Sequence, residues 1–269
     1  MLYERDYLLG LTEAEKQQYE EVTGRKFGEK RVSGFGRVNN FLAYPKAARM
    51  CKSLFPNNYL DVAELRDAER LAAANEEFFS LLSDEACTER SILNFIKDKK
   101  YYHIIGSIIW GLSINIGNHG VYLFPEFQLG NSYKADYLLM GKSSGGYEFI
   151  FIELESPYGN ITLKDGQLGA EFRDGISQLE DWKRWLPANY SSFGEVMRKH
   201  KNNALDLPEE FYVLDMSRFH YVVISGRRSD FQDKTYIIKR ERKKADDIDI
   251  IHYDNLYDFS NNLIGKLTY

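Results

Sequence analysis

The sequence predicts an α/β fold, in which a mixed sheet covered by helices follows a mainly helical N-terminal region. Apolar residues recur at helical intervals before about residue 120 and at the shorter intervals of strands after it. The candidate strand at 147–155 is apolar on both faces, which is typical of an interior strand with helices on both sides. A long amphipathic segment follows, so strands and helices are combined as in α/β proteins.

Helical signals dominate the first part of the chain. Thr12 to Glu15 has the spacing of a capping box and predicts the start of a short helix. Residues 62–82 keep apolar side chains at helical intervals among alanine, glutamate and arginine. Two further helices are expected at 88–96 and 104–110. These segments form the α layers of the predicted fold.

Strand signals begin at residue 121. Three candidate strands, separated by turn-forming segments rich in glycine and serine, lie at Val121 to Leu129, Tyr133 to Met140 and Tyr147 to Glu155. They predict a β-meander. A long helix is expected from Asp165 to Leu186, because apolar residues recur there at intervals of three and four. The remaining elements are expected as a strand within 211–225, a helix at 235–244, a strand at 248–253 and a closing helix at 255–267.

Composition and charge exclude several classes of protein. A content of 43% apolar residues is ample for a packed core. Cys51 and Cys87 lack metal-ligand spacing, so neither a zinc site nor a disulfide framework is expected. No apolar run approaches the ~20 residues of a membrane span and no signal peptide is evident, so we expect a cytoplasmic protein with no membrane partner. The net charge of -5 argues against a generally basic nucleic-acid coat.

One local stretch is basic. Between Arg227 and Lys244 there are eight basic residues and three acids. Such a run is typical either of a solvated helix face or of a surface that contacts phosphates.

Two carboxylates are predicted to face each other across the second and third strands. If the turn between these strands is symmetric, paired residues have numbers that sum to 289. Asp136 then lies opposite Glu153, and Lys134 lies opposite Glu155, all four on one face. Carboxylates in this position repel by about 3 kcal/mol at roughly 5 Å and an effective dielectric near 20. A divalent cation, Mg²⁺ or Mn²⁺, offsets this repulsion well; the alternatives are a solvated sheet end or a Lys134 to Glu155 ion pair.

The order of several short motifs resembles the nuclease domain of the Shedu anti-phage defence family, a branch of the PD-(D/E)XK superfamily. The central motifs, within residues 124 to 185, are Tyr133-Lys134-Ala135-Asp136-Tyr137, Phe151-Ile152-Glu153-Leu154-Glu155-Ser156-Pro157 and Gln178-Leu179-Glu180-Asp181-Trp182. Upstream, Glu89-Arg90-Ser91-Ile92-Leu93 resembles the acidic first helix of such cores. Residues 222–228 and 253–256 resemble the family's closing segment. The similarity covers roughly residues 85 to 260.

The resemblance implies a fold, an activity and partners. The fold would be a restriction-endonuclease-like core at 85–269, preceded by a helical region at 1–84 that serves assembly or sensing in a homo-oligomer. The activity would be that of an endo- or exodeoxyribonuclease that acts on DNA with Mg²⁺ or Mn²⁺. Asp136 and Glu153, together with Glu155 or Glu89, would hold the metal.

One position departs from the superfamily pattern. The superfamily places a lysine two residues after the strand acid, and this chain has Glu155 there. Lys134 is a candidate for a migrated lysine that orients the attacking water. Alternatively, Glu155 is itself a ligand or base, or the site binds without cutting and the chain is an inactive nuclease-fold module. Gln178 would help to order the metal site or is a rim residue, and Arg227 and Arg228 would contact phosphates.

Overall fold

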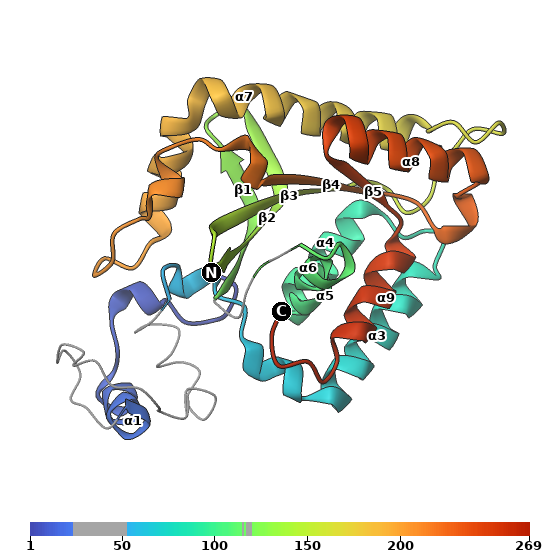
Figure 1. Ribbon diagram of the computed structural model, residues 1–269. Helices are drawn as coiled ribbons and strands as arrows, with labels where there is room; N and C mark the ends of the chain where they lie inside the picture. Colours follow the sequence, from blue (N-terminus) through green and yellow to red (C-terminus); the bar gives the residue numbers. More distant parts are fainter. Residues whose placement is uncertain (24–52, 115, 117–119) are drawn as a thin grey trace.

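A five-stranded mixed sheet separates two helical layers, which confirms the predicted α/β fold (Figure 1). The structure is a computed structural model that describes residues 1–23, 53–114, 116 and 120–269. The prediction at Cys51 lies outside these residues, whereas Cys87 is a buried free thiol. The strands, in their order across the sheet, are β1 (Val121–Leu129), β2 (Tyr133–Ser143), β3 (Gly146–Leu154), β4 (Phe219–Ile224) and β5 (Ile248–Ile251).

The first three strands form the predicted meander. β1, β2 and β3 are antiparallel neighbours, and β4 and β5 add to β3 in parallel. In the β2–β3 ladder, Tyr137 pairs with Ile152 and Ser143 pairs with Gly146, so the predicted register is confirmed. The ladder stops at the Tyr137 pair. Asp136 and Glu153 therefore lie directly beyond its last rung.

Helices cover both faces of the sheet (Figure 1). One layer consists of α7 and α8, and the other contains α3, α4, α5, α6 and α9. The α-helices of the described residues are α1 (Glu13–Thr23), α3 (Ala68–Leu82), α4 (Glu89–Lys99), α5 (His103–Gly106), α6 (Ile108–Gly111), α7 (Ala170–His200), α8 (Asp233–Asp246) and α9 (Tyr253–Leu263). In the described parts of the chain, none of these helices has the length and apolarity needed to cross a membrane.

Several helices differ from their predicted extents: α5 and α6 stand where one helix was predicted, and α9 ends before 267. Two further differences have a clear physical reason. The segment at 62–82 divides at Asp67, whose side chain accepts a hydrogen bond from the Arg70 N–H (3.2 Å) and so begins α3 afresh. The helix expected to end before Pro187 instead continues to His200, with a kink at Asn189. Pro187, two residues before the kink, has no N–H to donate to the carbonyl of Lys183, and so it interrupts the helical hydrogen bonds there.

Aromatic side chains fill the core between the sheet and α7. Phe149 of β3 stacks on Phe219 of β4 at 4.8 Å between ring centroids and meets Phe193 of α7 edge-on at 5.5 Å. Trp182 of α7 is fully buried in the same core. Burial of such rings gives β3 rigid support on this face.

We expect Phe149→Ala to lower the free energy of unfolding by about 3 to 5 kcal/mol, because it removes a fully buried ring and leaves a cavity. Urea denaturation measures the change. Phe79→Ala is the control: that ring is 40% exposed, so its loss should cost only about 1 kcal/mol. Equal losses from both variants would contradict the assignment of the core.

Candidate metal centre at the end of β3

Four acidic side chains gather where β3 ends, and we call them the acid cluster: Glu89, Asp136, Glu153 and Glu155. β2 supplies Asp136 and β3 supplies Glu153, while Glu155 follows β3 directly. Glu89 lies in the first turn of α4, which begins in a capping box between Thr88 and Ser91. Each strand acid is at least nine-tenths buried.

Asp136 lies where β2 changes face. In a regular strand Ala135 and Tyr137 would share one face, but here Ala135 packs into the α7 core and Tyr137 into the opposite core. The same change occurs in β1, where Glu126 has a φ of 50° and is skipped in the pairing with β2. Such irregularities re-aim side chains next to functional sites.

The Asp136 carboxylate joins β2 to β3 beyond the last rung of their ladder. Its Oδ2 accepts a hydrogen bond from the backbone N–H of Leu154 at 2.8 Å. That N–H is buried and requires an acceptor, which the side chain supplies. Asp136 and Glu153 are thereby held close enough to repel each other.

The carboxyl pKa values are raised throughout the cluster. Burial, and then repulsion from Asp136 and Glu155, raises the pKa of Glu153 to about 10. Burial, and then repulsion from Glu89 and Glu171, raises the pKa of Glu155 to about 8. Burial raises the pKa of Asp136 to about 6, although its hydrogen bond from Leu154 acts in the opposite direction.

Two oxygens of the cluster lack a hydrogen-bond partner among the described residues. They are Oε2 of Glu153 and Oε1 of Glu155, and both are buried. Gly175 of α7 lies over Glu155: a Cβ there would come within 2.9 Å of Glu155 Cγ and 2.6 Å of Val223 Cγ2. Glycine at position 175 therefore leaves room for the Glu155 carboxyl group, which forms no ion pair with a described residue.

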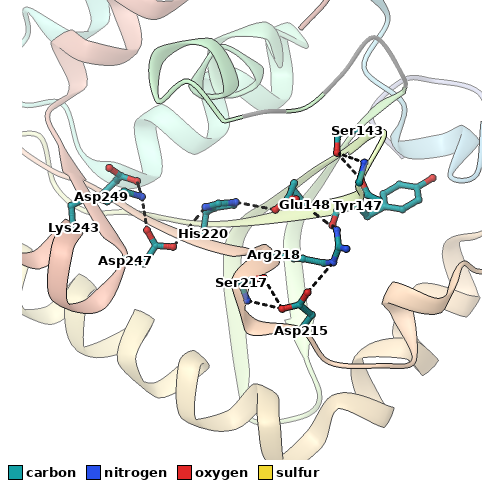
Figure 2. A network of polar contacts seen from close by, with 12 residues as sticks. Ser143, Tyr147, Glu148, Asp215, Ser217, Arg218, His220, Lys243, Asp247 and Asp249 are labelled. Carbon is teal, nitrogen blue, oxygen red and sulfur yellow. Dashed lines mark hydrogen bonds and ion pairs between the residues drawn. The ribbon is translucent and has the colours of Figure 1, made fainter.

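Acids near the opposite end of β3 have basic partners, unlike those of the acid cluster (Figure 2). Glu148 contacts Nε2 of His220 at 3.1 Å and Nη1 of Arg218 at 3.7 Å. Nearby, Lys243 donates to both Asp247 (2.6 Å) and Asp249 (2.9 Å). The fold thus supplies basic partners to half-buried acids where no cation site is expected. The acid cluster has no such direct partner among the described residues.

The chemistry of the acid cluster fits a hard divalent cation. Carboxylate oxygens without donors are the ligands that Mg²⁺ and Mn²⁺ prefer. In the described residues, however, no three His, Cys, Asp or Glu side chains are arranged so that they could hold a metal ion. Binding a cation would therefore require the carboxylates to draw together by side-chain rotation.

The structure separates Lys134 from Glu155, which overturns the predicted contact between them. The ammonium of Lys134 donates to Oε1 of Glu126 at 2.9 Å. The change of face at Asp136 is the physical reason, since strict alternation would have placed Lys134 and Glu155 on the same side. Lys134 still lowers the pKa of both Asp136 and Glu89, so its charge reaches the cluster from the other side.

The other predicted site residues have diverse surroundings. Arg227 is partly buried and forms a bidentate pair with Asp254 (3.1 and 2.9 Å), and it also donates to Tyr158 Oη. Its contact with phosphates stays a prediction. Arg228 is 56% exposed and pairs with Asp258. Gln178 is exposed on α7.

Sequence reasoning missed two acids of α7, Glu171 and Asp174, which both raise the pKa of Glu155. Their spacing from Gln178 puts them on one side of the helix and was the available signal.

Gly175→Ala should destabilise the protein, although glycine to alanine within a helix ordinarily stabilises it by about 1 kcal/mol. The added methyl would overlap Val223 and Glu155. Thermal unfolding of the metal-free protein measures the effect, with Ser177→Ala on the exposed side of α7 as control. If Gly175→Ala raises the melting temperature, the close approach of Glu155 to α7 is wrong.

The metal-free protein should lose stability from the acid cluster as pH rises. Glu153 ionises near pH 4.5 when exposed and near 10 when folded, so the folded state holds the extra proton between these values. The stability that the folded protein gains from this bound proton is therefore fully present below about pH 4.5 and is lost towards pH 10. Glu153→Gln should match the parent at pH 4.5 and be more stable at pH 8. Melting curves in EDTA measure this, and parallel pH profiles would exclude the burial of an ionisable Glu153.

Comparison with known proteins agrees with the order of these elements along the chain. The family model described as Shedu protein SduA, C-terminal, matches residues 86–257. No curated protein matches the chain. The matched span begins just before α4 and ends within α9, so it contains the whole sheet and every residue of the acid cluster. Since this match covers well over half of the sequence, the chain belongs to the Shedu family.

Proposed function

We propose that this protein is a Mg²⁺- or Mn²⁺-dependent deoxyribonuclease that acts in anti-phage defence. Membership of the Shedu family supports the defence role. The observation that carries the nuclease proposal is the pair of unpartnered, buried oxygens on Glu153 and Glu155, beside Asp136. Acids whose pKa values are strongly raised by burial and by neighbouring acids occur more often at functional sites than elsewhere.

The acid cluster would hold the metal. Asp136 and Glu153 are the principal ligands of the proposal, with Glu155 or Glu89 completing the set. The bound ion would supply an activated water and neutralise charge on the phosphate. Glu155, at the position of the superfamily lysine, would serve as a ligand or as a base, since a carboxylate cannot stabilise an anionic phosphate as an ammonium does.

Cations at the rim would bind the DNA backbone. Arg90 is exposed in the first turn of α4 and lowers the pKa of both Glu89 and Asp136, so its charge lies near the cluster. Lys134 and Arg228 are the other rim cations in the proposal. A contribution of residues 1–84 to assembly of a homo-oligomer in the cytoplasm also belongs to it.

A second function, DNA or protein binding without cleavage, is favoured by one observation. Glu155 occupies the lysine position, and the one lysine predicted to replace it pairs with Glu126 instead. Cleavage that depends on a divalent metal distinguishes the two functions.

The parent should cut linear or circular DNA with Mg²⁺ or Mn²⁺ and not with EDTA. Asp136→Ala should abolish cutting. In the metal-free protein it relieves repulsion but leaves the buried N–H of Leu154 without its acceptor, so the net change in stability should be small. Loss of a ligand should also remove any rise in melting temperature on adding Mn²⁺. Gel assays and melting curves measure these effects.

Glu148→Gln provides the control, because Glu148 is an acid of β3 that lies at the other end of the strand from the acid cluster and has basic partners. Glu148→Gln should cut DNA as the parent does, and it should be less stable than the parent. A parent that neither cuts DNA nor gains stability from either metal would refute the nuclease proposal and leave the binding function.

A further inference from the structure

Glu126 has a backbone conformation that few residues adopt. It is a glutamate with a φ of 50°, within β1. Its neighbours Pro125 and Phe127 pair with β2, while Glu126 stands unpaired opposite Asp136. Left-handed residues other than glycine are uncommon in strands, and such strain clusters at functional sites. A glycine would fit this backbone more easily, so the side chain of Glu126 calls for an explanation.

That side chain holds a lysine. Oε1 of Glu126 accepts a hydrogen bond from Lys134 at 2.9 Å, and Oε2 lies 3.8 Å from Lys97 of α4. The pKa of Glu126 is lowered, first by the hydrogen bond from Lys134 and then by its charge. Both lysines are on the α4 side of the sheet, whereas Glu155 lies beneath α7.

Without Glu126, the acid cluster would be the strongest attraction for Lys134. Two buried oxygens of the cluster have no hydrogen-bond partner among the described residues. The charge of Lys134 already lowers the pKa values of Asp136 and Glu89. A lysine carries its charge on a flexible four-carbon stem and can move between nearby carboxylates. An ammonium that entered the cluster would compete with a divalent ion for the same oxygens.

We propose that Glu126 is a positioning residue that holds the Lys134 ammonium at the rim of the acid cluster, so that Glu153 and Glu155 stay available to a divalent cation. The inference rests on the proposed function and deepens it. It gives a role to a glutamate at this unusual backbone position and adds to the separation of Lys134 from Glu155 that the change of face at Asp136 produces. Lys134 at the rim is also exposed enough to contact a phosphate.

Mn²⁺ binding, measured by calorimetric titration without DNA, tests the inference. Glu126→Gln releases Lys134 and should weaken Mn²⁺ binding about tenfold, a coupling of the size found between neighbouring charged groups. Lys134→Gln alone should bind Mn²⁺ at least as tightly as the parent. The double variant should regain the parent's affinity, because no ammonium is left to compete. Glu126→Gln with unchanged affinity, or a double variant as weak as Glu126→Gln, would overturn the proposal.

Glycine substitutions separate the side chain from the backbone. Glu126→Gly and Ser113→Gly each relieve a positive φ, so both should raise the melting temperature. Only Glu126→Gly should weaken Mn²⁺ binding, and Lys134→Gln should reverse that loss. If both glycine variants bind Mn²⁺ as the parent does, Glu126 has no positioning role. A parent that binds no Mn²⁺ and cuts no DNA would instead refute the proposed function itself. That result concerns the parent alone, so it is distinct from any difference between the parent and these variants.

Discussion

Burial of carboxylates without counter-charges is the constraint on which the rest of the structure depends. Asp136 of β2, with Glu153 and Glu155 at the end of β3, is removed from water, and the cost of ionising these buried neighbours raises their pKa values and opposes folding of the metal-free protein as pH rises. The chain holds them there with a sheet packed on both faces by apolar cores. The stacked aromatic rings of β3 and β4 make this part of the sheet hard to deform. The site can therefore be repulsive and still be well positioned.

Local rules predicted much of this arrangement. A short, symmetric hairpin fixes its own register, so the numbering of β2 and β3 was enough to place Asp136 beside Glu153. The same rule misplaced Lys134, because it assumes that side chains alternate without interruption. The alternation of β2 is interrupted at Asp136, opposite Glu126 of β1, and a glutamate with a positive φ carries no sequence signal of its own. The alternation of side chains predicts which face a residue occupies within each part of the strand, but it fails across the interruption.

Contacts between distant segments lay beyond the reach of the sequence. Arg227 belongs to a basic run that predicts phosphate contacts, and nothing in that run indicates its bidentate partner Asp254, which is 27 residues away in α9. The sequence gives no signal for the role of Gly175, which only the close approach of α7 to Val223 and Glu155 explains. In both cases tertiary structure decided the role of the residue.

The charge of the site bears on whether the protein cuts DNA or only binds it. Glu171 and Asp174 add to the acid cluster from α7, and the cations that act on its pKa values are Lys134 and Arg90. Without a metal this surface repels a phosphate backbone, so it is a poor choice for a module that only binds DNA. A divalent ion reverses the local sign and makes the same acids useful. The acids are therefore easier to understand in a metal-dependent enzyme than in a binding module, even though Glu155 stands where the resemblance predicts a lysine.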